Sequence, residues 1–120
     1  MTIQVDIWLR GTDFATTDSI EEVAREPGAW IDDDVRAVLE GMLHAMDRAK
    51  HPGQARRVAA LRGFSWIVNA FEDGGVVIAI EMTLGAAVAG PFPIDKAVLE
   101  AMIGRVLAAQ APEASSTSVH

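Results

Sequence analysis

The sequence predicts a small α+β protein, with a three-stranded, mainly antiparallel sheet and helices packed on one face. Two long apolar runs, residues 57–71 and 76–88, flank a Glu-Asp-Gly-Gly segment. Asp-Gly between β-branched and aromatic runs is a strong signal for a β-hairpin. A third, alternating apolar segment begins the chain, and the other apolar residues repeat at helical spacing. The expected order is therefore strand, helix, helix, strand, strand, helix.

The loop length of the predicted hairpin decides which side chains share a face of the sheet. A two-residue loop would place Trp66 opposite Glu81 and would mix polar and apolar side chains on both faces. A three-residue loop, Asp73-Gly74-Gly75, separates them, because side chains alternate along a strand with a period of two. The apolar face then takes Phe64, Trp66, Val68, Ala70, Ile78, Ile80, Met82 and Leu84, and the second face takes Gly63, Ser65, Ile67, Asn69, Ala79, Glu81, Thr83 and Gly85.

The first strand and a short helix are predicted before the main helix. Apolar and polar side chains alternate over residues 2–9, which is typical of a strand with one buried face. Asp18-Ser19, followed by two glutamates, indicates the start of a helix of about two turns, and Pro27-Gly28 indicates its end. The buried face of the strand takes Ile3, Val5, Ile7 and Leu9, and its second face takes Gln4, Asp6 and Trp8.

Two longer helices are predicted in the rest of the chain. Three consecutive aspartates, Asp32 to Asp34, suit the positive end of a helix dipole and open a helix that extends to about Lys50. Asp95 can cap a second helix. The apolar stripe of the first helix takes Val35, Val38, Leu39, Met42, Ala45, Met46 and Ala49, and that of the second takes Val98, Leu99, Met102, Ile103 and Val106.

The composition limits the class of protein. A chain of 120 residues, half of them hydrophobic, is large enough for one folded domain, which we place at residues 1–109. Residues 110–120 are rich in Ala, Ser and Thr, so we expect a disordered tail. The chain has no cysteine, no basic stretch at its start and no apolar stretch that could span a bilayer. We therefore expect a soluble cytoplasmic protein that binds no membrane.

The charge is negative overall and unevenly distributed. A net charge of −7 argues against nucleic acid as a partner, because neutralising phosphates requires clustered Lys and Arg. Acidic residues gather in the first third of the chain, whereas the segment from Arg48 to Arg62 is basic and has no acidic residue. The two regions can complement each other within a subunit or across a dimer. The basic segment could instead bind a phosphate or an acidic partner.

One group of side chains has the spacing of metal ligands. His44, Asp47 and His51 share a helix face with Asp33 and Glu40, and imidazole and carboxylate groups can bind a divalent metal. This face is opposite the apolar stripe, and a convex, solvated helix face does not bring ligands together. We therefore predict no metal site.

Motifs for phosphate binding and nucleophilic catalysis are incomplete. Residues 85–90 have the glycine spacing of a phosphate loop, but Pro91 and Phe92 replace the Lys and Ser/Thr that bind the phosphates and the metal. Ser65 follows a glycine but lacks the second glycine of a nucleophile elbow. The sequence therefore predicts no cofactor and no catalytic residue.

The second face of the sheet carries the candidate site residues. Carboxylates, an amide, hydroxyls and an indole among small residues could line a ligand pocket, and paired carboxylates can perform acid–base chemistry. The ordinary alternative is a solvated sheet face, and small residues also allow another chain to approach closely. The candidate ligand-binding residues are Asp6, Trp8, Ser65, Asn69, Glu81 and Thr83, and the candidate interface residues are Trp8, Ile67, Ala79 and Gly85.

Two hypotheses about function follow. The first is a small, acidic, non-catalytic interaction module, a homodimer that acts as an adaptor, a chaperone-like protein or a neutralising partner, with itself or another protein as the partner. It is favoured because the sequence shows no nucleophile set, cofactor motif or convergent ligand cluster, and a homodimer is favoured because open, apolar strands need a cover. The alternative is a small-molecule-binding protein or an enzyme that uses Asp6, Asn69 and Glu81 on the second face of the sheet.

Overall fold

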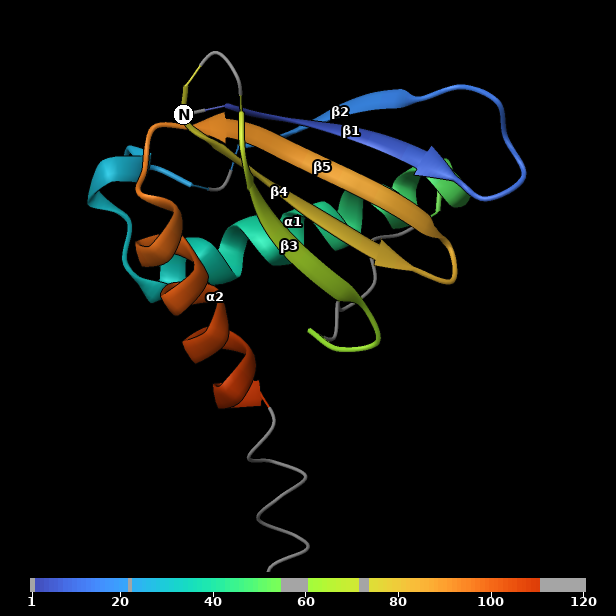
Figure 1. Cartoon of the computed structure of the whole chain (residues 1–120). Coiled ribbons are helices and arrows are strands. Elements are labelled where there is room, and N and C mark those ends of the chain that lie inside the picture. Colours follow the sequence, from blue (N-terminus) through green and yellow to red (C-terminus); the bar gives the residue numbers. More distant parts are fainter. Residues whose placement is uncertain (1, 22, 55–60, 72–73, 111–120) are drawn as a thin grey trace, which may run out of the picture.

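The structure is a computed structural model that describes residues 2–21, 23–54, 61–71 and 74–110. Within these residues the chain forms a five-stranded antiparallel sheet, with strand order β2-β1-β5-β4-β3, and two α-helices (Figure 1). The elements are β1 Ile3–Leu9, β2 Thr16–Ile20, a short 3-10 helix Pro27–Ala29, α1 Asp32–Lys50, β3 Ser65–Ala70, β4 Val76–Met82, β5 Gly85–Phe92 and α2 Lys96–Gln110.

The α+β class predicted from the sequence is right, but the three-stranded sheet is wrong. The apolar run over residues 76–88, which we expected to be one strand, contains most of two strands. Thr83 and Leu84 form a tight turn, so that Met82 lies opposite Gly85 and β5 returns beside β4. This turn has neither Asn-Gly nor Asp-Gly, and an apolar run continues through it. The sequence pattern therefore concealed the turn.

The predicted short helix after β1 is also wrong, because its first part is strand β2. This strand pairs with β1 along five residues, and Ile20 lies opposite Ile3 in the core. Asp18, which we expected to cap a helix, accepts a hydrogen bond from its neighbour's backbone, Ser19 N–H, at 2.7 Å. Its carboxylate also pairs with Arg48 of α1 at 2.9 Å. The pairing of β2 with β1 therefore outweighed the local sequence signal for the start of a helix.

The predicted hairpin is confirmed as β3 and β4, and its division into two faces is confirmed within these strands but not for Thr83, Leu84 and Gly85. Trp66 of β3 lies opposite Ile80 of β4, so the even-numbered residues of both strands face the core. The loop differs from the prediction, because Phe71 N–H donates to Gly75 O at 3.0 Å and Gly75 belongs to the closing pair. Asp73, the first residue of the predicted loop, lies outside the described residues. Of the predicted core residues of this hairpin, Val68, Ile78 and Ile80 are fully buried, and Trp66 and Met82 are half-buried.

Both helices cover the same face of the sheet. Helix α1 has the predicted bounds and packs against β1, β2 and β5, whereas α2 packs against α1 and β3. In Figure 1 the strands lie in front of α1, and neither of the two described helices lies over the face turned toward the viewer. The predicted cap of α2 is confirmed, since Val98 N–H donates to the Asp95 carboxylate at 3.1 Å. Val98 itself is 51 % exposed and does not belong to the apolar stripe as expected.

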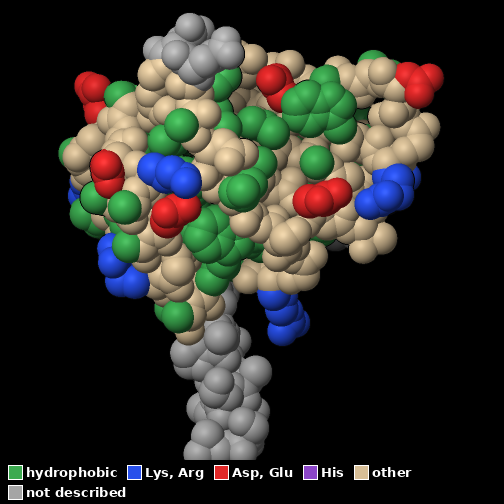
Figure 2. Space-filling model, viewed as in Figure 1, with side chains coloured by type: hydrophobic (Ala, Val, Ile, Leu, Met, Phe, Trp, Pro, Cys, Tyr) green, Lys and Arg blue, Asp and Glu red, His purple; other side chains and the backbone are tan. Residues whose placement is uncertain are grey.

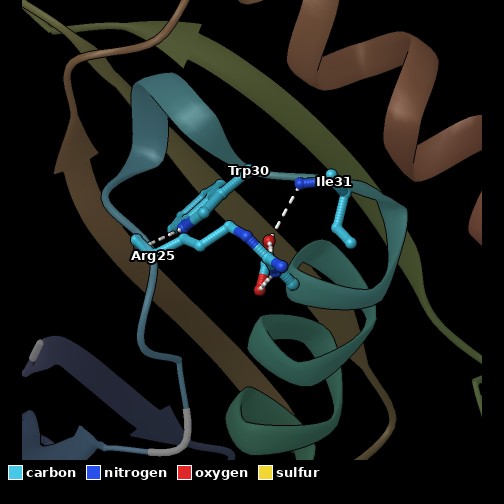
Figure 3. A network of polar contacts seen from close by, with 4 residues as sticks. Arg25, Trp30 and Ile31 are labelled. Atoms are coloured by element: carbon cyan, nitrogen blue, oxygen red, sulfur yellow. Dashed lines mark hydrogen bonds and ion pairs between the residues drawn. The ribbon is translucent and has the colours of Figure 1, made fainter.

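A polar network holds the start of α1 (Figure 3). The carboxylate of Asp34 accepts a hydrogen bond from Ile31 N–H at 2.9 Å and pairs with the guanidinium of Arg25 at 3.1 Å. The indole N–H of Trp30 donates to the carbonyl oxygen of Arg25 at 2.9 Å. The Trp30 ring then packs edge-on against Phe92, with 4.9 Å between ring centroids. The connection between β2 and α1 is therefore tied to the central strand β5.

The predicted tail, residues 110–120, lies outside the described residues except for Gln110, which ends α2. Within the described part of the chain, the structure contains no helix with the length and apolar character required to cross a membrane.

The central strand β5 approaches its neighbours closely at Gly85. This residue has φ of +154°, and a Cβ atom there would overlap the backbone carbonyl oxygen of Trp8 on β1. Gly104 on α2 is the opposite case, because, apart from its chain neighbours and the backbone of its own helix, no described heavy atom lies within 4 Å of the position that its Cβ would take. Gly85 therefore has to remain glycine, whereas Gly104 can be replaced by alanine.

We expect Gly85→Ala to lower the free energy of unfolding by about 1–3 kcal/mol, because the added methyl group forces β5 away from β1. The matched variant Gly104→Ala should raise it by about 0.5–1 kcal/mol, because alanine is the better helix former. Urea unfolding followed by circular dichroism measures both. Equal effects of the two substitutions would contradict the close approach at Gly85.

Candidate functional site

The face of the sheet over which the described part of the chain places no helix, called the open face below, is an ordered array of side chains. Strand pairing places its residues in rows that run across the sheet, because cross-strand partners point to the same side. One row contains Trp8, Ala86, Glu81 and Ser65, and the next contains Thr17, Asp6, Val88, Ala79 and Ile67.

The open face is low in the middle and higher at its sides. The residues contributed by β5 are small, whereas Trp8 on β1 is 44 % exposed and Ile67 on β3 is 51 % exposed. Figure 2 shows that hydrophobic side chains gather over the strands with a few acidic ones among them, and that Lys and Arg lie toward the sides. A hollow of about 460 Å³ lies on β3, β4 and β5. It is lined by Ser65, Trp66, Ile67, Ala79, Ile80, Glu81, Ala86 and Val88.

The open face is acidic. Its strand positions hold Asp6 and Glu81 and no Lys, Arg or His. The carboxylate of Asp6 accepts a hydrogen bond from the hydroxyl of Thr17 at 3.0 Å. Glu81 is exposed and has no hydrogen bond or ion pair within the described part of the chain. Arg10 follows the end of β1, but its Nε donates to the backbone oxygen of Thr83 at 3.0 Å.

The three residues proposed for acid–base chemistry share the open face but do not converge. Asp6 and Glu81 are two strands and two residues apart, which corresponds to roughly 12 Å between their Cα atoms. Asn69 is farther, at roughly 14 Å from Glu81 and roughly 16 Å from Asp6 by the same strand spacings. Two carboxylates at this separation do not share a proton or a small substrate atom. The open face therefore holds no acid–base pair of the kind that the sequence hypothesis needed.

Seven of the nine predicted site residues lie on the open face, and two do not. Thr83 lies in the turn between β4 and β5, and Gly85 is buried on the face that the helices cover. Both were assigned by continuing the alternation of β4 through this turn. Because Met82 lies opposite Gly85, the alternation starts again in β5 with the odd residues inward. The seven residues on the open face are Asp6, Trp8, Ser65, Ile67, Asn69, Ala79 and Glu81.

The same error hid two residues of the site. Ala86 and Val88 form the floor of the hollow, but the sequence interpretation did not include them among the site residues. The signal that could have identified them is the recurrence of small residues at every second position, at Gly85, Ala87 and Ala89. These residues are buried, and their alternation defines a strand separate from β4.

The side chains considered as metal ligands lie on α1. Among the described residues, no group of three or more His, Cys, Asp and Glu side chains is arranged to bind a metal ion. Our expectation that His44, Asp47 and His51 form no metal site stays a prediction. In the basic segment, Arg48 pairs with Asp18, and Arg56 and Arg57 lie outside the described residues.

A second hollow, of about 530 Å³, lies between the start of α1 and α2. Arg105 of α2 binds the carboxylate of Asp32 at its edge with two hydrogen bonds of 2.9 Å. This hydrogen-bonded pairing with Arg105 holds the pKa of Asp32 below its ordinary value of 3.8, with a smaller contribution from the charge of Arg36. The hollow is lined by Trp30, Ile31, Asp32, Asp33, Val98, Met102 and Arg105.

We expect Arg105→Gln to raise the pKa of Asp32 toward its ordinary value, and Arg36→Gln to raise it less. Because the folded-state pKa is the lower one, the ion pair stabilises the fold above pH 3.8, and this contribution is lost as the pH falls through the folded-state pKa. NMR titration of the Asp32 carboxyl carbon measures the shift. An unchanged midpoint in Arg105→Gln would contradict the pairing.

No family model, no curated protein and no solved structure matches the chain.

Proposed function

We propose that the protein is a non-catalytic interaction module that docks another polypeptide on the open face of its sheet. The observation that supports this proposal best is the combination of exposed Trp8 and Ile67 with a floor of Ala79, Ala86 and Val88. Exposed apolar side chains that lie together, with polar groups around them, are typical of protein-binding surfaces. Trp is also enriched among the residues that contribute most to binding.

The charge of the open face defines the chemistry of the partner. Asp6 and Glu81 lie among apolar residues, and the strands supply no cation on this side. The whole chain has a net charge of −7, which attracts positively charged partners over a distance. The partner that complements this face is a polypeptide segment with apolar side chains and at least one Lys or Arg. Charge complementarity of this kind favours specificity and fast association.

A second copy of the chain, the partner expected from the sequence, complements the face less well. Symmetric docking through the open face would bring two copies of Asp6 and Glu81 into one interface without a cation from either face. Like charges placed opposite each other in an interface are destabilising. Docking of a basic segment removes this repulsion, and we therefore prefer it to the homodimer.

A small molecule is the second candidate ligand, and the volume of the hollow favours it. About 460 Å³ lies within the usual range for ligand pockets. Such pockets also need several polar groups that converge on the ligand. Among the described residues that line this hollow, only Ser65 and Glu81 have a hydroxyl or a charged side chain, so the proposal of a polypeptide partner agrees better with the geometry.

Selection of peptides from a random displayed library, with the folded chain as target, tests the proposal. The selected peptides should combine apolar and basic residues and should shift NMR signals of the open face. Ile67→Lys should weaken their binding by about tenfold or more, because it places a cation on the apolar side wall of the hollow, where it repels a basic partner. The matched control is Val98→Lys on α2, which changes a residue of equal exposure and should leave the affinity unchanged.

Two results would contradict the proposal. The first is a set of selected peptides that shift signals on another surface and bind Ile67→Lys as well as the parent chain. The second is a stable dimer in sedimentation equilibrium that Ile67→Lys dissociates, because that result would assign the open face to a second copy. A monomer at high concentration agrees with the proposed partner.

A further inference from the structure

One row of the open face has an acid and an indole on either side of an alanine. Trp8 of β1 lies opposite Ala86 of β5, and Ala86 lies opposite Glu81 of β4. Neighbouring strands are about 4.8 Å apart, so the Cα atoms of Trp8 and Glu81 are roughly 10 Å apart with only a methyl group between them. We call this row the slot, because an indole and a carboxylate stand on either side of a short side chain.

We propose that this slot, formed by Trp8, Ala86 and Glu81, binds one Lys or Arg side chain of the partner. The proposal rests on the proposed function and specifies the chemistry that the open face recognises. The alkyl part of the side chain lies on Ala86, where a larger residue would block it. The cationic end then lies between the Trp8 ring, which attracts a cation through its π electrons, and the Glu81 carboxylate.

The slot is free to accept a cation from outside the chain. Glu81 has no hydrogen bond or ion pair within the described residues, and Trp8 is 44 % exposed. The nearest basic residue along β1 is Arg10, and its Nε donates to the Thr83 backbone oxygen. Arg10 and Glu81 form no ion pair within the part of the chain that the structure describes. Within the described residues, the charge of Glu81 is therefore not neutralised by an ion pair.

The other acid of the open face provides an internal comparison. Asp6 lies one row away, opposite Val88, and has no aromatic residue across from it. Its carboxylate already accepts the hydroxyl hydrogen bond from Thr17 at 3.0 Å. Asp6 and Glu81 carry equal charge on the same face, but only Glu81 faces an indole across a small residue. Glu81→Gln therefore tests recognition in the slot, whereas Asp6→Asn tests the general attraction of cations to the open face.

The test uses N-acetyl-arginine amide as the probe, with its neutral isostere N-acetyl-citrulline amide as the control. NMR titration of the full chain should show saturable shifts of the Trp8 indole and of the Ala86 and Glu81 amides with the arginine probe only. Glu81→Gln and Trp8→Leu should each weaken binding by about threefold or more, the loss expected for one ion pair or cation–π contact at an exposed site. Asp6→Asn should change the affinity by less than either.

The proposal is overturned if the citrulline probe binds as well as the arginine probe, if Asp6→Asn weakens binding as much as Glu81→Gln, or if no signal of the slot shifts. The selected peptides distinguish failure of this proposal from failure of the proposed function. Selected peptides that dock on the open face without a basic residue, and that are insensitive to Glu81→Gln, would overturn the slot alone. Selected peptides that bind another surface would overturn both.

Discussion

The small side chains of β5 are the constraint on which the rest of the structure depends. This strand lies in the centre of the sheet, and its helix-facing residues, Gly85, Ala87 and Ala89, are buried. These side chains are short, α1 packs against β5 as well as against β1 and β2, and the larger core residues come from α1 and from the strands on either side of β5. Close packing at this density allows little room for a larger residue at these positions.

The same strand also shapes the opposite side of the sheet. Ala86 and Val88 form a low floor, and the larger Trp8 and Ile67 stand on neighbouring or more distant strands. The hollow of the open face and the close packing of α1 therefore have one origin in the alternating small residues of a single strand. The middle of the open face is therefore apolar although it is not part of the core. Glu81 then gives the hollow its charge.

The sequence predicted the features that depend on local periodicity and capping. The alternation of β1, both ends of α1 and the Asp95 cap of α2 are visible in residues close to one another in the chain. Features that depend on distant contacts were not predictable in this way. Strand β2 exists because it pairs with β1, and its one buried residue leaves almost no pattern. The turn at Thr83 reversed the alternation, so Gly85 was misplaced and the floor residue Ala86 was missed.

The central claim is that the low floor created by β5 is the place where a partner docks. The most direct measurement is the affinity of Ala86→Leu for a selected peptide, together with its free energy of unfolding. Because Ala86 faces away from the helices, Leu should change the unfolding free energy by no more than about 1 kcal/mol. Peptide affinity should fall by about tenfold or more, whereas Ala101→Leu on the exposed side of α2 should leave it unchanged. An Ala86→Leu protein that is folded and binds the peptide as tightly as the parent chain would contradict the claim.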